Sequence, residues 1–176
     1  MPKYRKMLND INAPYLQSLM RLIEMQSKTT LANWSIDYAR ARILPIYKKS
    51  HPGDARCEHA LDAAVEWLEG NVKLPYVKNI IINECHAAAR EIDSDPAAQA
   101  AARSCGQAAA TIHTPTRSLG LALYGALAIA YDKLGADAGW DSLLAVAAEE
   151  CANMEAALRT VAVENEPNPA KISWNY

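Results

Sequence analysis

The chain has 176 residues and 51% of them are hydrophobic, which is enough for one domain with a substantial core. Its 18 basic and 20 acidic side chains leave a net charge of −2, which argues against functions that depend on neutralising many phosphates, so nucleic acid is not an expected partner. Alanine supplies 33 residues and phenylalanine none, a composition that favours closely packed helices over a β-sandwich.

Export and membrane insertion are not predicted. The N-terminal segment MPKYRKMLNDINAPY carries positive charge but lacks the apolar run of a signal peptide. The longest apolar run, residues 119–131, is shorter than the ~20 residues that a membrane-spanning helix needs. We therefore expect a soluble, cytoplasmic protein that does not bind membranes.

Neither the cysteines nor the histidines predict a metal or another cofactor. The cysteines have no Cys-x-x-Cys spacing and fall on apolar helix faces, so we expect reduced, buried thiols at Cys57, Cys85, Cys105 and Cys151. The nearest approach to a helical metal motif is a set of four residues on one segment. The four residues are Glu58, His59, Asp62 and Glu66. Four such residues on the solvent side of an amphipathic helix are typical of a charged surface, so no metal site is predicted there.

The first two helices are predicted from proline positions and apolar spacing. One covers residues 14–26 and begins with Pro14, because proline suits the first position of a helix. The next begins after Thr29 or Thr30. Pro45 lies late in this second helix, so we expect a kink or an early end near Leu44.

The third and fourth helices follow without a linker. The third starts after Asp54, whose carboxylate can cap the free amides of the first turn. It ends at Gly70, because glycine readily takes the positive φ of a helix C-terminus. The fourth covers about residues 75–91.

Two alanine-rich helices come next and are predicted to lie at the centre. Residues 96–113 have Asp95 as the cap and one narrow polar row, formed by Gln99, Arg103, Gln107 and Thr111. Residues 115–134 are nearly free of charge and end before Gly135. A helix that is apolar on most sides is expected to contact several neighbours.

The last predicted helix covers about residues 141–163, and its outer face is expected to carry Glu149, Glu150 and Glu155. The sequence thus predicts an all-α fold, a single compact array of about seven helices without a β-sheet. Residues 1–163 form the single all-helical domain, and residues 164–176 an extended C-terminal tail.

Four basic residues gather near the two most buried helices: His86, Arg90, His113 and Arg117. If they converge, they make a cationic pocket that can hold a carboxylate or poise an imidazole for proton transfer. Alternatively, His113 satisfies the last carbonyls of its helix and Arg90 pairs with Glu91 or Asp93. No catalytic residue is predicted, because Cys85 and His86 are neighbours on a helix and point about 100° apart.

The segments HAAARE and AAARSCGQAAATIHTPTRSLGLALYGALAIAY, together with the earlier HPGDAR, resemble the putative immunity protein family of bacteria. The resemblance covers about residues 31–131 and extends into residues 14–25 and the tail segment RTVAVENEPNPAKISW. The residues in register are His86, Arg90, Gln107, His113 and Tyr124. It implies a compact all-helical protein that is the antidote half of a toxin-immunity pair.

Three functions from different classes follow. The leading hypothesis is a non-catalytic protein that covers the working surface of a cognate protein toxin; the acidic residues Glu149, Glu150 and Glu155 could then meet a basic toxin. The alternative is a small helical enzyme or ligand-binding protein that uses the His/Arg pocket. The third is a homo-oligomer that associates through the aromatic tail residues Trp174 and Tyr176.

Overall fold

The computed structural model describes residues 3–175, and this part of the chain contains helices and no strand. Two π-helical segments join α-helical segments end to end, so the described residues form seven continuous helices. This confirms the predicted all-α fold class. The segments in chain order are α1 (Pro14–Ile23), α2 (Lys28–Tyr38), η1 (Ala39–Ile43), α3 (Leu44–Ser50), α4 (Arg56–Leu68), α5 (Leu74–Ile80), η2 (Ile81–Cys85), α6 (His86–Glu91), α7 (Pro96–Ala110), η3 (Pro115–Arg117), α8 (Ser118–Leu134) and α9 (Trp140–Val161).

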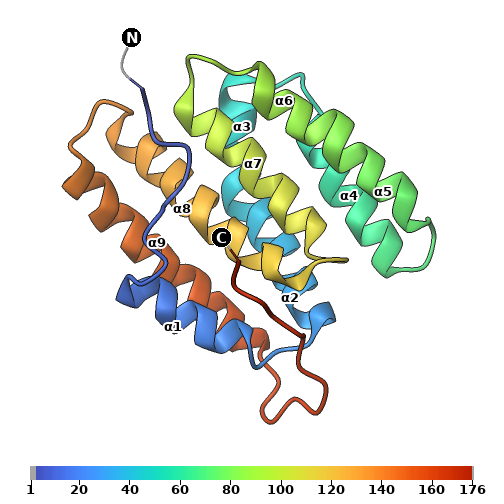
Figure 1. Ribbon diagram of the computed structural model, residues 1–176. Helices are drawn as coiled ribbons and strands as arrows, with labels where there is room; N and C mark the ends of the chain where they lie inside the picture. Colours follow the sequence, from blue (N-terminus) through green and yellow to red (C-terminus); the bar gives the residue numbers. More distant parts are fainter. Residues whose placement is uncertain (1–2, 176) are drawn as a thin grey trace.

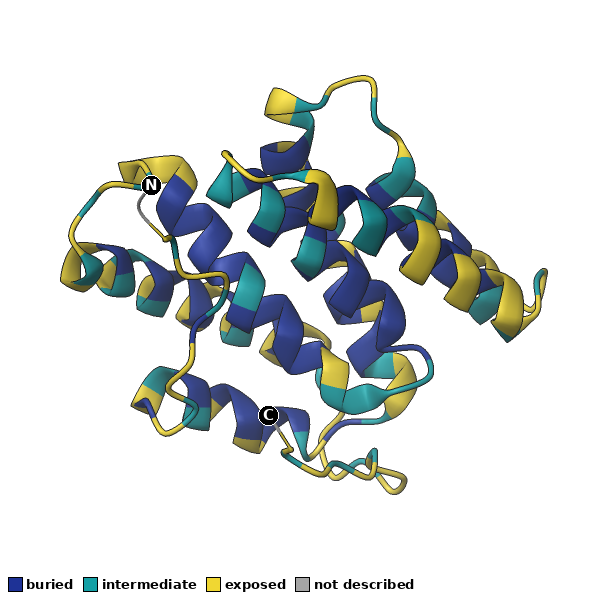
Figure 2. Ribbon diagram, turned by 45° about the horizontal axis from the view of Figure 1, so that its top comes forward, coloured by how far each residue is buried: buried dark blue, intermediate teal, exposed yellow. Residues whose placement is uncertain are grey.

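The alanine-rich helices α7 and α8 lie in the middle of the molecule, as the sequence predicts. Figure 1 shows α1 and α9 on one side of this pair and α4, α5 and α6 on the other. Nearly all of α8 is buried, and Figure 2 shows the buried colour running along the central helices while the outer helices are striped with exposed residues. Small alanine side chains let several helices approach α7 closely.

Local signals set most of the helix ends. Asp95 caps α7, because its carboxylate accepts a hydrogen bond from the Ala98 amide at 3.1 Å. Gly70 and Gly135, with φ of 80° and 87°, follow the ends of α4 and α8. Ser27, rather than a threonine, caps α2.

Of the two predicted outcomes near Leu44, a kink or an early end, the early end is wrong, because the helix continues to Ser50. The π-helical segment η1 ends at Ile43, two residues before Pro45, and the Leu44 amide donates to the Ala39 carbonyl, five residues back. A wider turn at this place gives the proline ring room that a regular α-helix lacks. The helix therefore passes the proline instead of ending.

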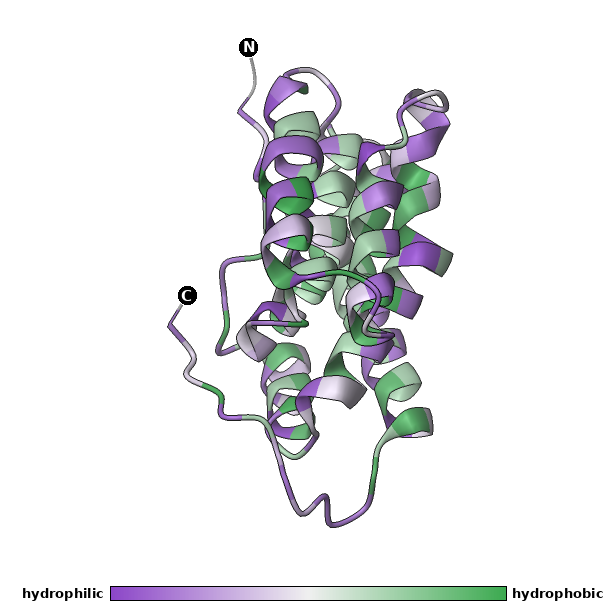
Figure 3. Cartoon of the chain, turned by 90° about the vertical axis from the view of Figure 1, so that its right-hand side faces the viewer, coloured by the Kyte–Doolittle hydropathy of each residue, from purple (hydrophilic) through white to green (hydrophobic). Residues whose placement is uncertain are grey.

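The N-terminal arm, from residue 3, and the C-terminal segment, up to residue 175, lie on one side of the molecule (Figure 3). The N-terminal arm crosses α8, where the Leu8 amide donates to the Leu123 carbonyl at 2.9 Å. Residues 162–175 contain no helix and fold back on the end of α1, where the Ala170 amide donates to the Gln26 carbonyl at 2.9 Å. Trp174 Nε1 donates to Glu24 Oε1 at 2.6 Å. Tyr176 lies outside the described residues.

The four cysteines, Cys57, Cys85, Cys105 and Cys151, are free and buried, as predicted. They lie in α4, η2, α7 and α9 and fill part of the core. No helix within residues 3–175 is both long and apolar enough to cross a membrane.

Candidate functional site

His86 is the first residue after the π-helical segment η2, and its amide donates to the Ile81 carbonyl, five residues back. The half-buried imidazole lies directly against Gly106 of α7. A Cβ atom placed on Gly106 would be 2.5 Å from Cε1 of the imidazole, so only glycine leaves room for the ring as it stands. The Nδ1 atom is buried and has no hydrogen-bond partner among the described residues.

Gln107, the residue after Gly106 in α7, also packs its side chain against a glycine, Gly120 of α8. Its side chain is 8% exposed, and a Cβ atom on Gly120 of α8 would be 2.4 Å from its Oε1. This oxygen is also buried without a hydrogen-bond partner within residues 3–175. Buried polar atoms are nearly always paired, so two orphaned atoms on neighbouring contacts mark an unusual place in the core.

The positive charges of three arginines from three elements act on His86: Arg90 in α6, Arg103 in α7 and Arg117 in η3. Burial and then these three charges, Arg103 first, lower the pKa of His86 from 6.5 to about 4. The imidazole is therefore neutral at pH 7. We call Arg90, Arg103 and Arg117 the arginine face.

No carboxylate of the described residues lies within 4.0 Å of any guanidinium nitrogen of the arginine face. Glu91, which follows Arg90 in the chain, instead binds Arg56 through two hydrogen bonds of 3.0 and 2.7 Å. The alternative in which Arg90 pairs with Glu91 or Asp93 is therefore not what the structure has. Basic side chains elsewhere do pair with carboxylates, among them Arg40, Arg42, Lys48, Lys49 and Arg56.

His113 lies at the far end of α7 from Arg90. Its Nδ1 is 2.8 Å from the Thr114 hydroxyl. Burial, and then the positive charges of Lys78, Arg117 and Lys28, lower its pKa. Arg117 thus neighbours both imidazoles. The structure places Arg90 and Arg117 near His86, whereas His113 has Arg117 as the one neighbour from the four predicted pocket residues.

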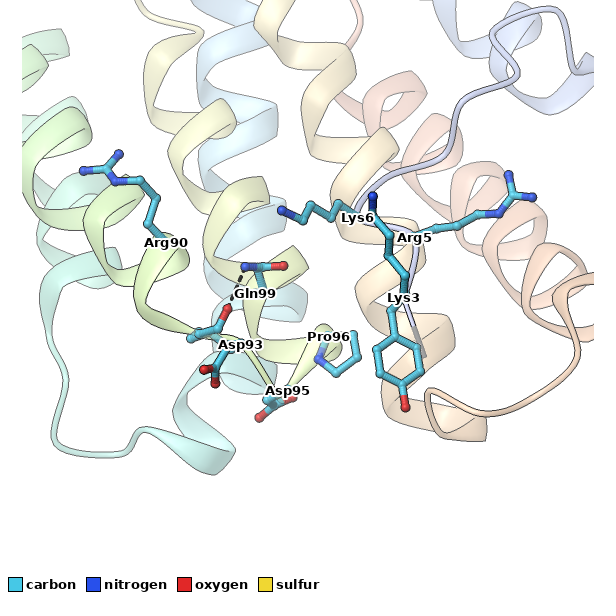
Figure 4. A pocket seen from close by; sticks show the side chains of 10 residues that line it. Lys3, Arg5, Lys6, Arg90, Asp93, Asp95, Pro96 and Gln99 are labelled. Carbon is cyan, nitrogen blue, oxygen red and sulfur yellow. Dashed lines mark hydrogen bonds between the residues drawn. The ribbon is translucent and has the colours of Figure 1, made fainter. Parts of the chain in front are cut away.

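A cavity of about 370 Å³ opens at the Arg90 end, between the N-terminal arm and α7. Figure 4 shows Lys6 reaching from the arm toward Gln99, with Arg90 on the far side of Gln99. Gln99 donates to the carbonyls of Ala89 at 3.0 Å and Ile92 at 2.8 Å, so it fixes the end of α6. Basic residues outnumber acidic ones around this cavity, which is lined by Lys3, Arg5, Lys6, Arg90, Asp93 and Asp95, among others.

The sequence did not predict that the N-terminal lysines would join the basic residues of α6. Lys3 and Lys6 are more than 80 positions from Arg90, and the arm has no periodic pattern that fixes its path. Arg103 was placed on the polar row of its helix, but nothing local to α7 showed that His86 lies beside that row. A longer-range signal was the pair of glycines, Gly106 and Gly120, inside alanine-rich helices.

Glu150 is not on the outer face of α9, and this corrects the predicted acidic surface. It is 1% exposed, and its carboxylate accepts hydrogen bonds from Tyr38 and from Arg42, at 3.0 Å in the latter case. Burial opposes its charge, but the hydrogen bonds from Arg42 and Tyr38 outweigh burial and lower its pKa. Position 150 lies three residues after the buried Ala147 and four before the buried Met154, so α2 covers it.

The two other glutamates of that predicted surface differ from each other. Glu149 is exposed. Glu155 is half-buried; its Oε2 is 3.4 Å from Arg159, and its Oε1 is buried with no hydrogen-bond partner in the part of the chain that the structure describes. The acidic surface of α9 is therefore smaller than the sequence indicates.

Within residues 3–175, no group of three or more His, Cys, Asp or Glu side chains is arranged to hold a metal ion. The four residues of the third predicted helix with metal-like spacing have other partners, and Glu66 accepts a hydrogen bond from Asn71 at 3.1 Å. Glu58 pairs with Lys48 at 2.7 Å, Asp62 with Arg40 at 2.8 Å, and His59 Nδ1 lies 2.8 Å from Glu84.

The comparisons with known proteins give one match. A family model described as Imm-5 like putative immunity protein matches residues 21–157. This range includes most of the chain, with His86, Gln107 and the whole arginine face inside it. Comparison with curated proteins and with solved structures found no match.

Proposed function

The chain belongs to the Imm-5 like putative immunity protein family, and from this premise we propose that it binds a cognate protein toxin and neutralises it by covering a working surface, without catalysing a reaction. The observation that carries the proposal is the family match over residues 21–157. Neutralisation by coverage needs a rigid scaffold and a complementary patch, and it needs no reactive group.

The scaffold has the rigidity that this role needs. Most of α7 and α8 is buried, and α7 contacts α8, α4, α3, α6 and α2. Capping and ion pairs fix the helix ends and the surface, as at Asp95 and at the Arg42–Glu150 pair. An interface on such a scaffold loses little conformational entropy when it forms.

The alternative is a ligand-binding protein or enzyme that uses His86, Arg90, His113 and Arg117. The observation that favours it is the orphaned Nδ1 atom of His86. Against proton transfer stands the pKa of His86, which at about 4 is far from the value near 7 that a general acid or base at neutral pH needs. We therefore place this alternative second.

Self-association through the tail has less support. Trp174 is half-buried and bonds Glu24 within the same chain, so its indole is already in use. Removal of residues 167–176 should leave the elution volume in size-exclusion chromatography at the monomer position. A shift from a dimer to a monomer on truncation would favour the oligomer instead.

The test is protection of growing cells. The genes on either side of the coding gene are searched for a large secreted protein, and its C-terminal region is expressed from an inducible promoter in a laboratory bacterial host. We expect plating efficiency to fall when this region is induced alone and to recover when the protein is co-expressed. No recovery against any neighbouring toxic region would contradict the proposal.

A further inference from the structure

The arginine face combines positive charge from elements that are distant in sequence. Arg90 ends the α5–α6 helix, Arg103 lies in the middle of α7, and Arg117 precedes α8. The polar row of α7 beside them spans about 12 Å from Gln99 to Gln107, at 1.5 Å per residue. Arg90 lies one helical turn after His86, and Arg103 lies three residues before Gly106, against which the His86 ring packs. Arg117 lies three residues before Gly120, which meets Gln107 of α7. The three positions therefore lie on adjoining turns of neighbouring helices.

This surface is electrostatically unfavourable in the free protein. Like charges gather around a neutral imidazole, and no described carboxylate pairs with them. Arg117 also lies directly at the N-terminus of α8, where the helix dipole disfavours a cation. Unfavourable features such as unpaired like charges and a cation at a helix N-terminus concentrate at functional sites.

Two carboxylates near Arg90 are engaged elsewhere, and a third, Asp93, lines the same cavity as Arg90 without forming an ion pair with it within the described residues. Glu91 binds Arg56, and Asp95 accepts the Ala98 amide at the start of α7. A partner therefore does not have to displace an internal ion pair before it reaches the guanidinium groups. This lowers the free-energy cost of binding relative to a paired surface.

Resting on the proposed function, we infer that the arginine face is the surface that receives the toxin, and that it binds a patch of aspartate and glutamate side chains. Guanidinium groups bind carboxylates through two parallel hydrogen bonds, which gives orientation as well as charge attraction. Arginine is also enriched among the residues that dominate binding free energy at interfaces.

Neighbouring residues extend this surface in two directions. Lys3 and Lys6 continue the positive charge at the cavity beside Arg90. Along the α5–α6 helix, Lys78 and Ile82 precede His86 at four-residue spacing, and Ile82 is 53% exposed. An apolar side chain beside charged ones is typical of the centre of an interface, which buries about 800 Å² on each partner.

An acidic protein fits this surface better than a nucleic acid. The three guanidinium groups of the arginine face can match a small patch of carboxylates, whereas nucleic-acid binding usually depends on a longer series of phosphate contacts.

The experiment compares two triple charge reversals with equal change in net charge. The test variant is R90E/R103E/R117E. The control variant, K73E/K133E/K171E, changes exposed lysines that form no ion pair within the described residues. Circular dichroism and thermal melting verify that both fold. The probe is the purified toxic region from the protection assay, with binding measured by isothermal titration calorimetry.

We expect the test variant to lose at least ~100-fold in affinity and all protection, and the control to stay within about threefold of the wild type. The variant R90K/R103K/R117K, which keeps the charge but loses the planar fork, should fall between the two. An unchanged affinity and full protection with the test variant would overturn this inference while the proposed function stood. Failure of the wild-type chain to protect would overturn the proposed function instead.

A second probe separates the two classes of macromolecule. A fluorescent 20-base-pair DNA duplex is titrated at 150 mM salt with the wild type and the test variant. We expect no binding below about 100 µM with either protein, since a site for nucleic acid usually needs many phosphate contacts. Binding of the duplex more tightly than the toxic region, lost in the test variant, would overturn the inference.

Discussion

Replacement of Gly106 by alanine tests whether the imidazole of His86 is held against α7. The new Cβ would lie 2.5 Å from Cε1 and 3.0 Å from Nδ1 of the ring, and carbon atoms in contact are ~3.5 Å apart or more, so the ring must move by about 1 Å. Alanine inside a helix is worth about 1 kcal/mol over glycine, and overpacking costs about 1–3 kcal/mol. We expect G106A to lower the free energy of unfolding by about 1 kcal/mol.

The same substitution should have the opposite sign when the ring is absent. In the H86A background, Gly106→Ala meets no imidazole and should raise the free energy of unfolding by about 1 kcal/mol. The two results define a double-mutant cycle with a coupling free energy of about 2 kcal/mol. Urea denaturation followed by circular dichroism measures all four proteins.

The cycle is decisive because G106A is expected to lower the free energy of unfolding of the wild-type chain and to raise that of the H86A chain. If G106A stabilises the wild-type chain as much as the H86A chain, the coupling is zero and the described packing of His86 on Gly106 is refuted. A proton titration of the His86 ring by NMR adds a second readout. In G106A the displaced ring is more exposed, so its pKa should rise from about 4 toward 6.5.

Three further predictions follow from the charges of the molecule. Because the pKa of His86 is about 4 in the folded chain and 6.5 in the unfolded chain, the unfolded state binds the proton first, so the free energy of unfolding should fall between pH 6.5 and pH 4. For this partly exposed ring we expect a loss about 1–2 kcal/mol larger than in H86Q, where His113, whose pKa is also lowered, still titrates; urea denaturation across that range measures both proteins. R117Q removes a cation from the N-terminus of α8 and should raise the melting temperature by about 1–2 °C. It should also raise the pKa of His86, because one of the positive charges that lower this pKa is gone. A lower melting temperature would show that Arg117 stabilises the fold. R42A leaves the buried Glu150 without its cation and should lower the free energy of unfolding by about 2 kcal/mol. R40A breaks an exposed ion pair and should lower it by less than about 0.5 kcal/mol. Equal losses in the two variants would contradict the burial of Glu150.

The helices could be predicted because their signals are local. Asp95 with Pro96 starts α7, and Gly70 and Gly135 follow α4 and α8, since capping and positive φ depend on a few neighbouring residues. The central place of the alanine-rich helices followed from the near absence of polar faces.

The features that sequence reasoning missed depend on contacts between distant elements. The π-helical turns before Pro45 and His86 have no distinct residue pattern, so the sequence predicted a kink or an early end where the helix in fact passes Pro45. Glu150 was placed on the surface because its pairing with Arg42 is set by the packing of α2 on α9. For the same reason, the gathering of Arg103 with Arg90 and Arg117 emerged only from the fold.

The measurement that tests the central claim most directly is isothermal titration calorimetry of the purified wild-type protein with the toxic region encoded by a neighbouring gene. The account predicts a one-to-one complex with a Kd below about 1 µM, equivalent to about −8 kcal/mol or more favourable. Absence of binding, with a toxic region that is folded and kills cells, would contradict the claim that this protein neutralises its toxin by direct contact.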